Sequence, residues 1–162
     1  MAKKTKKKIG GPFLAGAFFC ETVIEDKGDD TLSAIRIIDQ VNILVPADAP
    51  PDFPSEQNRI RVPVVAILFF RTGDAKGSHS VRVEMESPTG KKNPPFEQVL
   101  PFSDVEHGGA NIRLNMTIGV VKGGLFLYDV FLDNKLVTRM PLKINVDREK
   151  PAQSDENTPP PQ

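Results

Sequence analysis

Apolar and polar residues alternate along most of this chain, with the period of two that a strand with one buried face requires. The stretch 110–121 places Ile112, Leu114 and Met116 on one face, and the stretch 80–87 places Val81 on the inner face. No stretch sustains the period of a helix. This pattern predicts eight strands, at 18–25, 33–45, 59–71, 80–87, 96–102, 110–121, 125–132 and 135–146.

Two of the strands are distinguished by where proline lies in them. The stretch 59–71 is apolar almost throughout from Val62 onward, which is typical of a central strand covered on both faces. Pro63 must then lie near the start of that strand or at a bulge. Pro101 predicts that the weaker strand 96–102 lies at a sheet edge.

Polar turns between the strands predict hairpins and, with them, the fold class. Residues 26–31 predict a hairpin between the first two strands, and the pair Asp133-Asn134 predicts a tight one near the end of the chain. We therefore expect an all-β protein: an immunoglobulin-like antiparallel β-sandwich of about eight strands with disordered termini. Strand spacing alone does not separate this topology from a jelly roll or a C2-like arrangement.

The length of 162 residues suits one folded domain. We expect a disordered lysine-rich arm at 1–11, a single β-sandwich domain at 12–146, and a disordered polar, proline-rich tail at 147–162. The single cysteine excludes an intramolecular disulfide.

The formal net charge of zero conceals an uneven distribution of charge. The arm holds five of the 21 basic residues, so 16 remain in the body against 21 acidic residues. An acidic body repels nucleic acid, which leaves the arm as the one segment expected to bind it or another anionic partner. These candidate anion-binding residues are Lys3, Lys4, Lys6, Lys7 and Lys8. The alternative, which we favour, is a solvated terminus without a partner, because no aromatic residues are interleaved to stack on bases.

The apolar segment after the arm determines the expected compartment. It runs from residue 9 to residue 20 and is interrupted at 10–12 by two glycines and a proline, whereas a spanning helix needs about 20 apolar residues. Phe18 and Phe19 precede Cys20 where a lipoprotein signal would place small residues. We therefore predict the first strand of a cytoplasmic protein, with no membrane span and with Cys20 facing the core. An unusual export signal is the alternative.

The stretches "PFLAGAFFCETVIEDKGDDTLSAIRIID" and "GGLFLYDVFLDNKLVTRMPLKI" resemble a family of small uncharacterised bacterial β-sandwich proteins. The resemblance covers residues 12–146 and rests on strand cores and turns, including the turn that precedes the "R-x-P-L" strand. It implies a bacterial source and supports a cytoplasmic location. It implies no activity, so no catalytic residue is carried over.

Cys20 is a candidate nucleophile, and it would need His79 or His107 as a base. We favour a buried, inert cysteine, since free cysteine on an apolar strand face usually behaves as a small hydrophobe. The same two histidines lack the spacing of a metal site. Ser103, Asp104 and His107 are close in sequence, but a triad is assembled by the fold and no G-x-S-x-G elbow is present.

Loop carboxylates raise the possibility of a calcium site, but their spacing does not match a calcium loop, and a solvated turn is favoured. They are Asp26, Asp29, Asp30, Asp48 and Asp52. The glycines at 122–124 and 87–92 lack the strand–loop–helix context of a phosphate site. We accordingly predict neither a metal nor a cofactor.

The sequence does not specify a biochemical function. The preferred hypothesis is a non-enzymatic interaction or structural module with an unknown protein partner. Its expected surfaces are the proline-rich loop 46–59, with Asp48, Asp52 and Phe53, and an edge strand that carries Pro101 or Pro141. The alternatives are anion binding through the lysine arm and an enzyme that uses Cys20.

Overall fold

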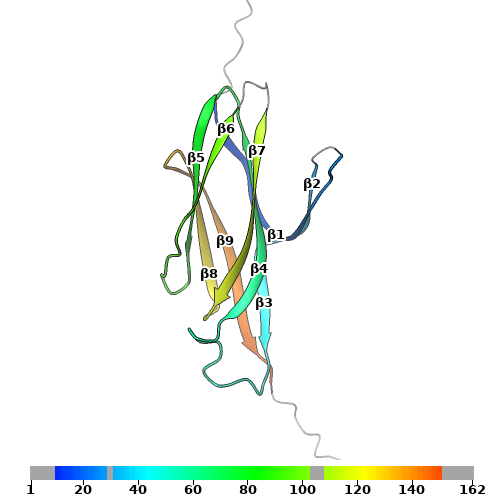
Figure 1. Ribbon diagram of the computed structural model, residues 1–162. Helices are drawn as coiled ribbons and strands as arrows, with labels where there is room; N and C mark the ends of the chain where they lie inside the picture. Colours follow the sequence, from blue (N-terminus) through cyan, green and yellow to red (C-terminus); the bar gives the residue numbers. More distant parts are fainter. Residues whose placement is uncertain (1–9, 29–30, 103–107, 151–162) are drawn as a thin grey trace, which may run out of the picture.

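The computed structural model describes residues 10–28, 31–102 and 108–150, which form β-strands and no helix (Figure 1). Nine strands lie in these ranges. They are β1 (Phe13–Glu25), β2 (Leu32–Ile38), β3 (Gln40–Val45), β4 (Ile60–Arg71), β5 (Gly77–Glu86), β6 (Phe96–Phe102), β7 (Gly109–Val120), β8 (Gly124–Leu132) and β9 (Lys135–Arg148).

The strands form two sheets that pack face to face. One sheet has the order β2-β1-β4-β7, and the other has the order β3-β9-β8-β5-β6. Neighbouring strands are antiparallel except β3 and β9, which are parallel. The chain crosses between the two layers after β2, β3, β4, β6 and β7, as in the connectivity of an immunoglobulin-like sandwich. The predicted fold class is confirmed.

The main core lies between the sheets and is centred on β4. Alternate residues of β4, among them Leu68 and Phe70, are fully buried against the facing sheet. The intervening residues Val65 and Ile67 are also buried, on the outer face. The prediction of a central strand covered on both faces is therefore confirmed, since β4 has β1 and β7 as its neighbours.

Pro63 lies near the start of β4, without a bulge in the pairing between β4 and β7. The last pair between β1 and β4 joins Cys20 and Val65, so β1 has already left the sheet at the level of Pro63. Proline is tolerated where no neighbouring strand needs its missing N–H group.

The face that Cys20 occupies differs from the prediction. Phe19 faces the main core, whereas the buried Cys20 belongs to a small separate cluster with Val23, Val65 and Ile67. The cause is that neighbouring residues of a strand face opposite sides, so with Phe19 and Ala17 inward, Phe18 and Cys20 face outward. Beyond Cys20, β1 continues only in the predicted hairpin with β2, which stands away from the sandwich (Figure 1). The cysteine is buried as expected, but outside the main core.

The predicted strand 33–45 is two strands that belong to different sheets. Strand β2 ends at Ile38 beside β1, and β3 begins at Gln40 beside β9. Between them, the carbonyl of Asp39 accepts a hydrogen bond from the Lys143 N–H group at 2.9 Å. The chain therefore crosses between layers at Asp39, which stands where the apolar series of residues 35, 37, 41, 43 and 45 would place an apolar side chain.

The two strands expected at an edge differ in outcome. Strand β6, with Pro101, is the edge strand of the five-stranded sheet, as predicted. Strand β9, with Pro141, lies between β3 and β8, so its assignment to an edge was wrong for the strand as a whole. Its pairing with β3 begins only at Lys143, however, and the part with Pro141 has one unpaired side.

The strands span residues 13–148, so β9 runs two residues into the segment expected as a tail. Residues 1–9 and 151–162 lie outside the described residues, and the predicted division into arm, domain and tail stays a prediction.

Candidate functional site

The loop 46–59 joins β3 to β4 at the end of the sandwich where β9 ends (Figure 1). Two turns shape its first half. The Ala49 N–H donates to the Pro46 carbonyl at 3.1 Å, and the Phe53 N–H donates to the Pro50 carbonyl at 3.0 Å. In the later turn the second position is Pro51, whose fixed φ is the one that such a turn needs.

Arg148, the last residue of β9, binds this loop through its guanidinium group. Its Nη1 donates to the carbonyl of Ala49 at 2.6 Å, and its Nη2 donates to the carbonyls of Pro50 at 2.9 Å and Phe53 at 3.3 Å. A guanidinium suits this role because it offers several donors in a fixed plane. The loop is therefore joined to the sheet by a side chain that lies about 100 residues away in sequence. Arg148 could not be identified from the sequence, since no local pattern links it to the loop.

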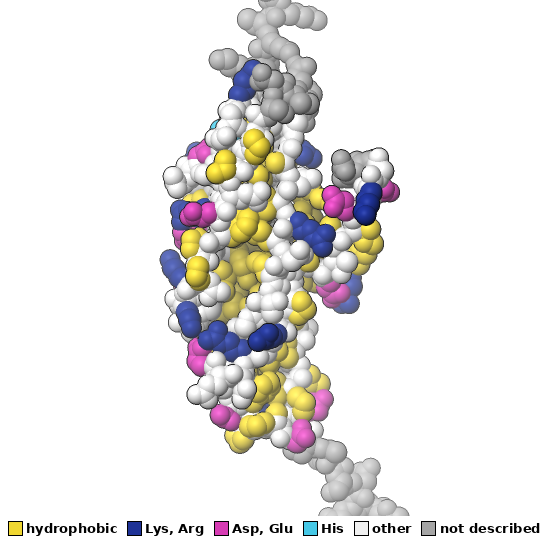
Figure 2. All heavy atoms as spheres, viewed as in Figure 1, with side chains coloured by type: hydrophobic (Ala, Val, Ile, Leu, Met, Phe, Trp, Pro, Cys, Tyr) yellow, Lys and Arg dark blue, Asp and Glu magenta, His cyan; other side chains and the backbone are white. Residues whose placement is uncertain are grey.

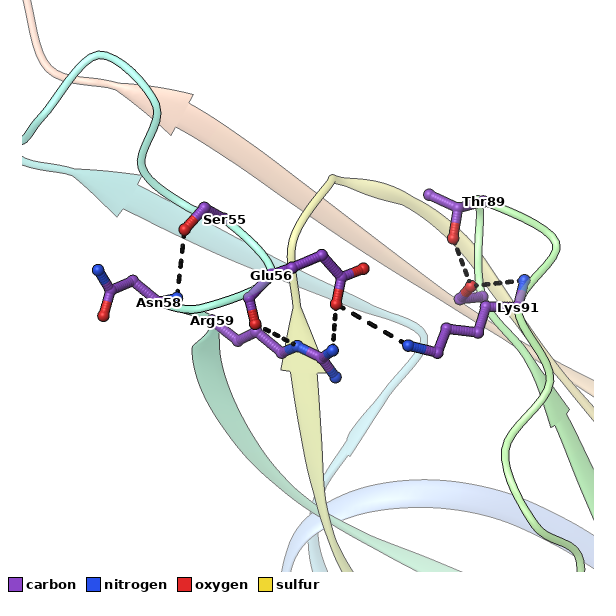
Figure 3. A network of polar contacts seen from close by, with 7 residues as sticks. Ser55, Glu56, Asn58, Arg59, Thr89 and Lys91 are labelled. Carbon is purple, nitrogen blue, oxygen red and sulfur yellow. Dashed lines mark hydrogen bonds and ion pairs between the residues drawn. The ribbon is translucent and has the colours of Figure 1, made fainter.

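The second half of the loop contacts the turn between β5 and β6 (Figure 3). The Glu56 carboxylate accepts a hydrogen bond from Arg59 and lies 3.8 Å from the Lys91 Nζ. The Asn58 N–H donates to the Ser55 hydroxyl at 3.2 Å. These contacts are exposed, so each contributes little to stability, but together they restrict the positions that the loop can take.

The three candidate residues of the loop differ in how far their side chains are exposed. Asp48 and Asp52 are exposed, and Phe53 is half-buried. Two carboxylates therefore project from a loop with several fixed backbone groups. Such an arrangement can serve as an interaction surface, because a loop that is already ordered loses less conformational entropy on binding.

Cys20 and His79 are not brought together. Cys20 lies in the four-stranded sheet, where burial raises the pKa of its thiol and the nearby Arg113 lowers it by a smaller amount. His79 lies in β5 of the other sheet, with its Nδ1 atom 2.7 Å from the Asp133 Oδ2. His107 lies outside the described residues.

His79 and Asp133 instead join the predicted tight hairpin between β8 and β9 to β5. Asp133 and Asn134 both have positive φ, as a two-residue turn of this kind requires. The Asp133 Oδ1 accepts the Ser80 N–H at 2.9 Å, and the hydrogen bond from His79 lowers the pKa of the Asp133 carboxyl. These contacts give His79 and Asp133 a structural role, which is to hold the hairpin against β5.

The remaining candidates include the possible metal ligands, the possible membrane span and the residues of the lysine arm, and only some of them lie in the described ranges. In the described ranges no three His, Cys, Asp or Glu side chains gather as they would around a metal ion. The described part of the chain has no helix that is long and apolar enough to cross a membrane. The other candidates lie outside the described residues: Lys3, Lys4, Lys6, Lys7, Lys8, Asp29, Asp30, Ser103 and Asp104.

The fold defines the class of this protein, an immunoglobulin-like β-sandwich. No family model matches the chain, and no curated protein matches it either. Among solved structures, the chain is similar to an immunoglobulin-like protein from Pseudomonas aeruginosa, with a TM-score of 0.36 and 12% identity. The match covers 84% of this chain and 98% of that one.

Proposed function

We propose that this chain is a non-enzymatic protein-binding module that binds its partner through the loop 46–59. The observation that carries this proposal is the contact of Arg148 with three carbonyls of the loop. It orders an exposed segment that carries Asp48 and Asp52, at one end of a sandwich, where such folds present their binding loops. The expected partner surface is basic, since these two carboxylates are the exposed charges between Pro46 and Phe53.

The separation of Cys20 from His79 removes one of its two candidate bases and so supports a binding role over chemistry, because a thiol needs a base within hydrogen-bonding reach to act as a nucleophile. The formation of β1 by residues 13–25 supports the proposal that the module works in a bacterial cytoplasm, since that segment was the candidate export signal. The family resemblance in the strand cores supports the same source.

The test is a quantitative pull-down from a bacterial lysate with the tagged full chain. A variant with Asp48→Lys and Asp52→Lys should lose its specific partner. A control variant with Glu25→Gln and Glu97→Gln, two exposed carboxylates elsewhere, should keep it. If the partner survives the loop variant and is lost only when residues 1–10 are removed, the arm binds it and the loop proposal fails.

A further inference from the structure

Among the residues that the structure describes, no strand pairs with the side of β7 that faces away from β4. Strand β7 is the last strand of its sheet, and all twelve of its residues pair with β4 without a register shift. The Thr72 N–H donates to the Gly108 carbonyl, which fixes the phase of this ladder. Because backbone groups alternate between the two sides of an antiparallel strand, Asn111, Arg113 and Asn115 direct theirs away from β4.

The other strand edges carry features that oppose the addition of a further strand. Strand β6 contains Pro101, and the open part of β9 contains Pro141. Strand β2 is irregular at Arg36, whose φ is positive, and β3 has only 6 residues. Strand β7 has 12 residues, no proline, and no lysine or carboxylate. Natural proteins usually protect such edges, so a long unprotected one indicates use.

A slot between the two sheets lies beside this open edge. It has a volume of about 160 Å³ and is lined mainly by apolar side chains, among them Met85, Phe96, Met116 and Tyr128. Phe96 pairs with the inward-facing Val83, yet 36% of it is exposed. The reason is that the four-stranded sheet ends at β7 and has no strand opposite β6. Figure 2 shows hydrophobic side chains exposed along this opening.

The charged side chains of β4 and β7 are all of one sign. Strands β4 and β7 contain three exposed arginines and neither aspartate nor glutamate. Arg71 pairs with Gly109, Arg113 lies within β7, and Arg61 pairs with Gly119, so positive charge lies near the start, the middle and the end of the strand. An added strand with acidic residues on its outer face would complement this row.

We propose that the open edge of β7 binds an extended acidic segment of another protein. The segment pairs with β7 through its backbone, directs its carboxylates toward the three arginines, and places one apolar side chain in the slot. Backbone pairing supplies affinity in such strand addition, while the alternate side chains supply specificity. Methionines at 85 and 116 suit a slot that adapts to its occupant. This surface shares no residue with the loop 46–59, so this proposal and the function proposed above can be tested separately.

The test uses two synthetic nine-residue peptides and the full chain labelled with ¹⁵N. Both peptides alternate valine with a charged residue around a central leucine, one with glutamate and the other with lysine. The glutamate peptide should slow hydrogen exchange at the amides of Arg113 and Asn115 and shift the resonances of Met116 and Phe96. Its affinity should fall as salt rises. The lysine peptide should produce no protection.

Two variants with matched controls locate the site. Asn115→Pro removes an outward N–H that β4 does not use and should abolish protection, whereas Ala34→Pro, on the β2 edge of the same sheet, should leave it intact. Arg113→Glu should lower the affinity for the glutamate peptide by about two- to fivefold, the effect of losing one exposed ion pair. Lys143→Glu, on the other sheet, should leave that affinity unchanged. Should Asn115→Pro fail to fold, the proposal is tested by whether Arg113→Glu weakens binding of the glutamate peptide more than Lys143→Glu does.

Several results would overturn the proposal. They are protection of β2 or β6 in place of β7, equal binding of both peptides, and unchanged binding by folded Asn115→Pro. Self-association of the free chain through β7, seen as peptide-independent protection that depends on protein concentration, would assign the edge to a second copy and also refute it.

Discussion

The contact between Arg148 and the loop 46–59 can be tested by replacing the arginine with alanine. The substitution removes three hydrogen bonds, of which the one to the Phe53 carbonyl is the longest at 3.3 Å. A hydrogen bond contributes about 0.5–1.5 kcal/mol net. Arg148 is exposed, so water can replace its donors at the freed carbonyls. The expected loss is therefore about 1–2 kcal/mol, near the lower end of the sum of three bonds.

The assay combines urea unfolding with amide hydrogen exchange. For a chain of this length, a loss of this size lowers the Tm by about 2–8 °C. The more specific result is faster exchange at the amides of Ala49 and Phe53, whose turns depend on the fixed loop. Arg148→Lys should restore little of the lost stability or of the slow exchange, because an ammonium group cannot reach three carbonyls as a planar guanidinium does.

Arg139→Ala is the matched control for this experiment. Arg139 is also an exposed β9 arginine, and its Nε donates to the Asp129 Oδ1 at 2.5 Å, on the cross-strand partner. Its loss should cost less than about 1 kcal/mol and leave loop exchange unchanged. If Arg148→Ala leaves the exchange of Ala49 and Phe53 as slow as in the native chain, the loop is ordered by its own turns and our account of it is wrong.

Three further predictions concern other parts of the chain. Because the His79 hydrogen bond lowers the pKa of Asp133, this carboxylate contributes stability that is present above the ordinary Asp pKa of about 3.9 and lost as the pH falls through the lowered value. Asp133→Asn should therefore lose less stability than the native chain in urea titrations between pH 7 and pH 3, and an equal loss would contradict the assignment. Cys20 should react with iodoacetamide at least about 100-fold more slowly in the folded chain than in urea, since it is buried and burial raises its pKa; rapid alkylation at neutral pH would revive the enzyme hypothesis. If the lysine arm binds anions, removal of residues 1–10 should abolish binding to a short DNA duplex, and the logarithm of the affinity should fall with the logarithm of salt concentration by about 0.9 per phosphate contact; affinity that is independent of salt would exclude this role.

Strand positions and turns could be predicted from the sequence because they depend on local patterns. The alternation in 110–121 specifies one buried face wherever that strand lies, and Asp133-Asn134 tolerates positive φ in any hairpin. Pro101 identified an edge because a missing N–H group is a property of the residue itself.

The choice of strand partners could not be predicted in this way, because it depends on residues far away in sequence. The apolar residues keep odd positions on both sides of Asp39, so the pattern favours one strand, although Asp39 itself interrupts the series where β2 and β3 divide between the sheets. The contact of Arg148 with the loop is equally non-local. The open edge of β7 follows from the absence of a neighbour, which its own residues do not encode. The one available signal was the absence of proline and of any lysine or carboxylate from a long strand.

The central claim, that the loop 46–59 binds another protein, is tested most directly by photo-crosslinking in the native host. The photoreactive residue p-benzoylphenylalanine would replace Asp52 in one strain and Glu97, which is also exposed, in a control strain. Our account predicts one dominant cross-linked protein from position 52, absent from position 97 and lost when Asp48→Lys is added. The same set of cross-linked proteins from both positions, or none from position 52, would contradict it.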